Sequence, residues 1–178
     1  MTRRMFLWLM AAAGVALRGR SSLAAQDVQY ARAMDRAQDS RPSNLGAKAR
    51  IAPTSEPGDP LIVRGRLRSL DGAAAAGAIV FAYHTDRGGL YDDPSKGPHS
   101  WRLRGWARTD AEGRFTFETM RPGAYPGGNV APHVHFTAYL ADGRYHTPQL
   151  NLPSTRQAAA GQPEEITVEL KPRAGDRF

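Results

Sequence analysis

Short apolar segments separated by turn residues dominate the chain from residue 61 onward. They are four to eight residues long, rich in Val, Ile, Leu, Phe and Tyr, and several alternate apolar with polar side chains. Asp-Gly pairs that end at Gly72 and Gly143 mark turns. No long helical period and no internal repeat is seen. The pattern predicts an all-β domain over residues 61–178, either a sandwich or a barrel, with these strands: residues 61–67, 78–84, 106–109, 114–118, 133–140 and 166–170.

Two of these segments are separated only by the turn residues 110–113. We therefore expect residues 106–109 and 114–118 to pair as a hairpin. Residues 86–100 contain too many Gly, Pro and Asp for a strand and are predicted to form a loop. Loops carry binding and catalytic residues more often than cores do, so this loop is a candidate for function.

Residues 1–25 have the pattern of a twin-arginine signal peptide. Arg3 and Arg4 precede an apolar run over residues 6–17, which is shorter than the roughly 20 residues that span a bilayer. Small residues at 22–25 suit a cleavage site. Such signals are read by a receptor and do not anchor the protein. The prediction is export by the twin-arginine machinery, a periplasmic or secreted location, and no stable membrane anchor after cleavage.

Residues 26–60 are predicted to form a polar linker or arm. Residues 26–38 have a weak helical spacing, and prolines interrupt any regular element further on. Without residues 1–25 the formal net charge falls from +7 to +3, because that segment holds four arginines and no acidic residue. A charge of this size gives no reason to expect nucleic-acid binding. The chain has no cysteine, which excludes disulfides and thiolate metal ligands.

His133 and His135 are the first candidates for chemistry. Alternate residues of a strand point to one side, so the two imidazoles would project from the same face, about 6.5–7 Å apart along the strand. Tyr91 and Tyr125 lie in Gly- and Pro-containing contexts and could complete a ligand set. Phenolate and imidazole suit an oxidised iron better than zinc. The alternative is structural, since a His-x-His pair also arises by chance and tyrosines near turns commonly pack at sheet edges.

An ordered series of motifs resembles the intradiol ring-cleavage dioxygenases of the catechol and protocatechuate type. Residues 86–91 match D-x-x-G-x-Y, residues 108–115 match R-T-D-x-x-G-x-F, and residues 119–126 match T-x-R-P-G-x-Y-P. The paired histidines in residues 132–136 and a T-x-Q segment at 147–152 follow in the family's order. The resemblance extends from about residue 61 to residue 152.

This resemblance implies a β-sandwich and a mononuclear, non-haem Fe(III) bound by Tyr91, Tyr125, His133 and His135. By the family pattern Tyr91 and His133 are equatorial ligands, and Tyr125 and His135 are axial. The implied activity is that of an oxidoreductase, which uses both atoms of O2 to cleave a catechol-type aromatic diol to a muconate-type diacid. Tyr125 would leave the metal and accept a substrate proton, and Gln149 would hydrogen-bond the rearranging intermediate.

One position departs from the family. The family usually has an arginine three residues before the first histidine, where this chain has Val130. Loss of a donor that stabilises developing charge typically lowers the rate by of order a hundredfold. Arg87 and Arg144 are candidates to replace it. Two alternatives stay open: a non-catalytic, transthyretin-like periplasmic binding module, and an enzyme of altered chemistry on the same iron site. Self-association is also open.

Overall fold

The computed structural model describes residues 32–33, 35–37, 40–91 and 101–177 of the 178-residue chain. The chain divides into two compact units, residues 1–41 and residues 42–178. In the first unit, residues 32–33 and 35–37 are helical, and the predicted signal peptide lies outside the described residues. No helix of the described part of the chain is long and apolar enough to cross a membrane.

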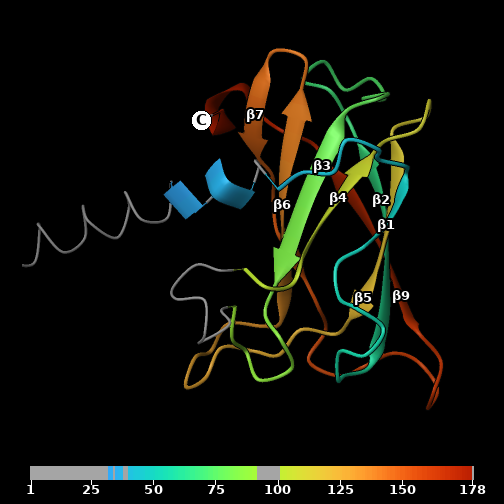
Figure 1. Ribbon diagram of the computed structural model, residues 1–178, viewed down its shortest axis with the longest axis vertical. Helices are drawn as coiled ribbons and strands as arrows, with labels where there is room; N and C mark the ends of the chain where they lie inside the picture. Colours follow the sequence, from blue (N-terminus) through green and yellow to red (C-terminus); the bar gives the residue numbers. More distant parts are fainter. Residues whose placement is uncertain (1–31, 34, 38–39, 92–100, 178) are drawn as a thin grey trace, which may run out of the picture. The chain divides into compact units, whose positions relative to one another are not determined.

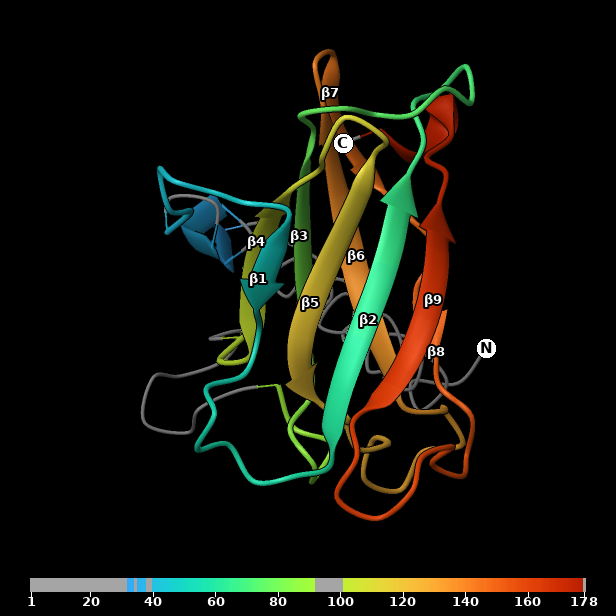
Figure 2. The same ribbon diagram turned by 90° about the vertical axis from the view of Figure 1, so that its right-hand side faces the viewer.

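The second unit is a β-sandwich of two facing sheets (Figures 1 and 2). The four-stranded sheet has the order β1 (Lys48–Arg50), β5 (Arg114–Met120), β2 (Pro60–Leu67) and β9 (Glu164–Leu170). The second sheet has the order β4 (Arg104–Arg108), β3 (Ile79–His84), β6 (His133–Leu140) and β7 (Gly143–His146), and β8 (Leu150–Asn151) pairs with β6. A short 3-10 helix follows β9 at Ala174–Asp176. The predicted all-β fold is confirmed, and it is a sandwich.

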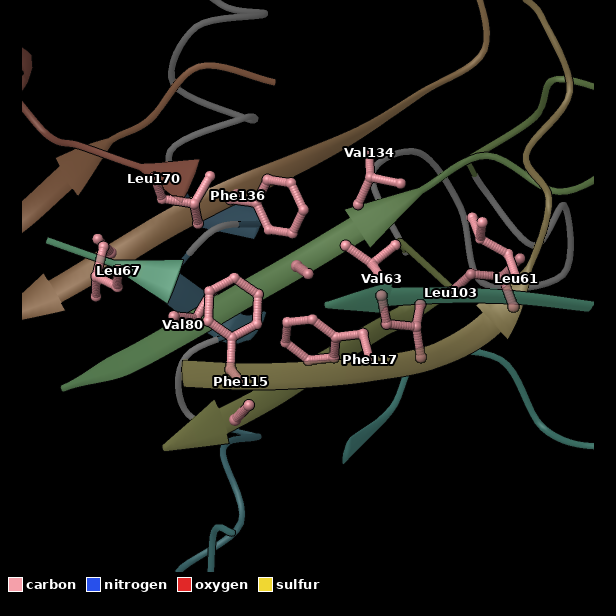
Figure 3. Packing of buried hydrophobic residues seen from close by; sticks show 14 of the residues in the cluster. Leu61, Val63, Leu67, Val80, Leu103, Phe115, Phe117, Val134, Phe136 and Leu170 are labelled. Atoms are coloured by element: carbon pink, nitrogen blue, oxygen red, sulfur yellow. The ribbon is translucent and has the colours of Figure 1, made fainter. Parts of the chain in front are cut away.

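Alternating residues of the two sheets form the core (Figure 3). On β2 the inward positions are Leu61, Val63, Gly65 and Leu67, of which the three larger residues are at most 1% exposed. Gly65 leaves room for the ring of Phe115, because a Cβ there would lie 1.9 Å from that ring. The alternating apolar residues in the sequence therefore mark the side of the sheet that faces the core. Gly65 belongs to this side because a larger residue would clash with the ring of Phe115.

The predicted hairpin over residues 106–118 is wrong. β4 pairs with β3 in one sheet, whereas β5 pairs with β2 in the other, so residues 109–113 cross between the sheets. The hydroxyl of Thr109 donates to the carbonyl of Ala75 at 2.5 Å and fixes the crossing. Both arrangements place the same alternate residues in the core. The alternation of apolar residues therefore cannot distinguish a hairpin from a connection between the two sheets.

Part of the predicted arm belongs to the sandwich. β1 pairs in parallel with β5, with Lys48 opposite Thr116, and the following Ile51 and Ala52 are buried in the core. This strand is only three residues long and two of its side chains, Lys48 and Arg50, are exposed cations. Short, charged edge strands are typical of sheets that avoid edge-to-edge pairing. Their composition also explains why the strand has no apolar pattern in the sequence.

Candidate metal centre

Four candidate residues lie at one end of the five-stranded sheet. In Figure 1 this is the lower end, where β3 ends and β6 begins. His133 and His135 are on β6 and point away from the core, because the intervening Val134 is a core residue. Tyr91 follows the turn after β3, and Tyr125 lies in the segment between β5 and β6. Two loops and one strand therefore carry the four side chains.

Their donor atoms converge on one point. The Oη of Tyr91 lies 2.5 Å from Oη of Tyr125, 3.2 Å from Nε2 of His133 and 2.8 Å from Nε2 of His135. Nε2 of His133 lies 2.9 Å from Oη of Tyr125 and 3.0 Å from Nε2 of His135. Tyr91 and His133 thus each contact the other three donors. The hydrogen bonds of the described residues include none between Tyr125 and His135.

This geometry fits a single metal ion. Four donors about 3 Å apart lie on a sphere with a radius of roughly 1.8–2.1 Å, which is close to a metal–imidazole bond length of about 2.0–2.1 Å. Nδ1 of His133 lies 2.8 Å from the carbonyl of Ala131 and must donate to it, so the lone pair of Nε2 faces the other donors. A second hydrogen bond of this kind is usual for metal-bound histidine. The tautomer of His133 is therefore the one that a metal requires.

The chemistry of the donors restricts the metal. In the described part of the chain no three His, Cys, Asp or Glu side chains are grouped so that they could hold a metal ion, so a metal here must use the tyrosine oxygens. Burial lowers the pKa of His135 to about 4, and the nearby His133 and His146 contribute to this shift. The imidazole is then neutral at pH 7, as a ligand must be. Two imidazoles with two phenolates suit an oxidised transition metal.

The loops that carry the two tyrosines are locked together through glycines. The amide of Gly123 donates to the carbonyl of Asp86 at 2.8 Å, and the hydroxyl of Thr85 donates to the carbonyl of Gly123 at 2.8 Å. A Cβ at Gly123 would lie 2.3 Å from the carbonyl oxygen of Arg87, and one at Gly89 would lie 2.0 Å from that of Ala124. Only glycine permits this approach of the two backbones. The contact fixes the spacing of the tyrosines that follow.

The comparisons with known proteins agree with this fold and this series of motifs. The profile of the family described as Dioxygenase matches residues 39–155. The chain belongs to the intradiol ring-cleavage dioxygenase family. It is 31% identical over 124 residues to catechol 1,2-dioxygenase 1 of Acinetobacter lwoffii, a match that covers 60% of this chain and 40% of that protein. The chain spans less than half the length of the curated relatives it matches.

Solved structures show the same fold. An intradiol ring-cleavage dioxygenase from Tetranychus urticae superposes with a TM-score of 0.57 at 20% identity, covering 77% of this chain and 91% of that chain. Catechol 1,2-dioxygenase from Acinetobacter sp. ADP1 gives 0.54 at 18% identity, covering 75% and 60%. The resemblance read from the motifs is thus confirmed at the level of family and fold.

Gln149 does not reach the four donors in this structure. Its side chain is exposed and donates to Oδ1 of Asn151 at 2.7 Å. The register of β8 on β6 pairs His133 with Asn151 and Val134 with Leu150, and Gln149 directly precedes β8 in the chain. Its role toward the substrate stays a prediction.

Val130, which stands where the family usually has its arginine, is 42% exposed. Arg144 lies on β7 opposite Tyr139, four residues along β6 from His135, which is about 13 Å. Arg87 is exposed and lines a cavity of about 440 Å³ with Asp59 and Arg121. Arg144 is thus too far away, and Arg87 remains the candidate on the Tyr91 loop.

His84, the last residue of β3, is fully buried. Its Nδ1 lies 2.7 Å from the carbonyl of Thr85 and must donate to it, so Nε2 accepts from the hydroxyl of Thr119, also at 2.7 Å. Burial lowers the pKa of His84 to about 4. The charged groups around it act in both directions: Glu56 and Asp86 raise its pKa, and Arg102 lowers it.

We expect the free energy of unfolding to decrease as the pH falls from about 6.5 to about 4. Within this window the unfolded chain binds a proton at His84 and the folded chain does not, which costs of order 3 kcal/mol in total. Chemical unfolding at several pH values would be measured for the wild type and for His84→Gln, which cannot titrate. The wild type should show the steeper loss. Parallel curves would contradict the assignment.

Proposed function

We propose that the protein is a non-haem ferric dioxygenase that cleaves a catechol-type aromatic diol with O2 to a muconate-type diacid. The observation that carries the proposal is the convergence of Tyr91, Tyr125, His133 and His135 on one point, with all five donor–donor contacts at 2.5–3.2 Å. Membership of the intradiol family supports the proposal. A relative named catechol 1,2-dioxygenase 1 supports the choice of a catechol-type substrate. A transthyretin-like binding module would not account for the convergence.

The contacts among the donors support distinct roles for them. Tyr91 and His133 each contact all other donors, so both would hold the ion from the middle of the set. Tyr125 and His135 have no hydrogen bond to each other among the described residues. These two residues would complete the ligand set.

The chemistry of the reaction follows from these positions. When bound, ferric iron would lower the pKa of the tyrosine and diol hydroxyls and make the diolate reactive toward oxygen. Tyr125 is half-buried and lies in the irregular segment between β5 and β6, so it can move away more readily than a histidine on β6. Its phenolate would accept a proton from the diol as internal base. Gln149, after rotation, would hydrogen-bond the rearranging ring.

The proposal includes the route by which the protein reaches its substrate. The twin-arginine pattern at residues 1–25 supports export of the folded protein, with the metal bound, to the periplasm or beyond. Fractionation of cells that express the whole chain would test this. Replacement of Arg3 and Arg4 by Lys should leave the protein in the cytoplasm.

The activity is tested with iron-loaded protein, catechol and 18O2. We expect one O2 consumed for each ring-opened diacid, with both labelled atoms in the product. Iron binding without this product would favour the altered-chemistry alternative. A protein that neither binds ferric iron nor opens the ring would favour the binding module.

The glycine contact between the tyrosine loops gives a prediction that alters no ligand. Gly123→Ala should force the loops apart, because its Cβ would lie 2.3 Å from the carbonyl oxygen of Arg87. We expect ferric iron to bind 10- to 100-fold more weakly, as is typical when residues that support ligands are changed. The affinity is measured by competition with a chelator. Gly175→Ala is the control, since nothing lies within 4 Å of its Cβ. Equal affinities in the two variants would contradict the prediction.

A further inference from the structure

The imidazole of His135 is held differently from that of His133. A hydrogen bond from Nδ1 to the carbonyl of Ala131 fixes the His133 ring. The hydrogen bonds of His135 to other described residues involve only Nε2, which faces the other donors. Rotation of a histidine ring about χ2 is soft. Another contact must therefore set the plane of the His135 ring.

Tyr83 supplies that contact. It lies directly opposite His135 on the neighbouring strand β3, so both side chains are on the same face of the sheet. The two rings are stacked with centroids 4.8 Å apart and planes inclined by 13°. Tyr83 also packs against Tyr91, with centroids 5.8 Å apart. One side chain thus contacts a histidine and a tyrosine of the donor set.

Tyr83 is itself immobilised. It is 6% exposed, and its ring contacts Trp101 at 5.0 Å and Phe81 at 5.7 Å between centroids. A stacked aromatic pair is worth about 0.5–1.5 kcal/mol beyond the burial of its surface. A fixed ring of this kind can restrict the soft torsion of His135 without a hydrogen bond.

We infer that Tyr83 is a positioning residue, whose ring stacks on His135 and holds its Nε2 toward the metal centre. The inference rests on the proposed function, because it concerns the same metal site. Tyr83 is not one of the four donors and would act through His135, on which it stacks. The aromatic face, rather than the hydroxyl, carries the role. Loss of the ring should therefore free His135 to rotate and weaken one ligand.

The test compares three variants in ferric iron affinity and in the visible spectrum of the iron-loaded protein. Tyr83→Leu removes the ring and should weaken iron binding at least about tenfold, as expected when a residue that orients a ligand is lost. It should also move the tyrosinate-to-iron band. Tyr83→Phe keeps the ring, so its iron affinity should stay within about twofold of the wild type. Its visible band should keep the wild-type position. Phe117→Leu is the matched control, since Phe117 is also a fully buried ring but lies on β5 in the other sheet, where its ring contact is with Phe115. It should leave the band in place.

The outcomes separate this inference from the proposed function. A coloured wild type with an unchanged Tyr83→Leu variant would overturn the role of Tyr83 and leave the proposed function intact. Equal losses in Tyr83→Leu and Phe117→Leu would also overturn it, because they would report general packing of the sandwich. A wild type that binds no ferric iron would overturn both. Should Tyr83→Leu not fold, Tyr83→Met fills a similar volume without a flat face and serves the same comparison.

Discussion

Tyr91→Phe is expected to abolish ferric iron binding and, with it, ring cleavage. Tyr91 contacts all three other donors, so its removal takes away the oxygen at the middle of the set and leaves the two imidazoles with a single phenolate. His133→Ala should have the same effect, because Nε2 of His133 also contacts all three. Iron content after dialysis against a chelator, together with the rate of diacid formation, measures the loss.

Tyr145→Phe is the control for removal of a buried tyrosine hydroxyl. Tyr145 is 1% exposed on β7 and donates to Oδ2 of Asp142 at 2.6 Å, away from the donor set. Its loss should lower stability slightly and leave iron content unchanged. Undiminished iron in Tyr91→Phe would rule out Tyr91 as a ligand.

Tyr125→Phe is expected to separate iron binding from turnover. The three remaining donors still contact one another, so iron should remain bound with a changed colour. Removal of a general base typically lowers the rate by about 10²- to 10⁴-fold. The expected result is thus a coloured protein with a blue- or red-shifted band and a strongly reduced kcat. Stopped-flow and steady-state kinetics with catechol would measure it.

The same variant has an outcome that contradicts the account. If Tyr125→Phe turned over catechol at the wild-type rate, Tyr125 could not be the residue that takes the substrate proton. Loss of all iron in this variant would instead mean that Tyr125 is as central to metal binding as Tyr91. The first result is distinguished from the predicted one by kcat, and the second by iron content.

The strands with an apolar pattern were predictable from the sequence. The predicted strands at residues 61–67 and 78–84 correspond to β2 and β3, and all six residues of β3 are buried, as a continuous apolar run indicates. β1 was not predictable, because three residues carry no periodicity, whereas β8 lies within the T-x-Q segment at residues 147–152 that the resemblance named. The crossing from one sheet to the other between β4 and β5 was not predictable either. Two strands that pair in one sheet and two strands in facing sheets show the same alternation of apolar residues.

The candidate site was predictable in its residues but not in its supports. The motifs named Tyr91, Tyr125, His133 and His135, and the structure brings their donor atoms together. Their assignment as metal ligands stays a prediction. Tyr83 has no signal in the sequence, because it reads as one more apolar residue of a buried strand. The glycine contact depends on the approach of two loops that lie more than 30 residues apart in the chain, which no local pattern reports.

The visible absorption spectrum of the iron-loaded protein, before and after catechol is added without oxygen, tests the central claim most directly. The account predicts a red-brown band from tyrosinate-to-iron charge transfer that moves to longer wavelength when the diol binds. That result would establish phenolate coordination and binding of the diol at the metal. A colourless protein that takes up no ferric iron would contradict the account and leave only the β-sandwich.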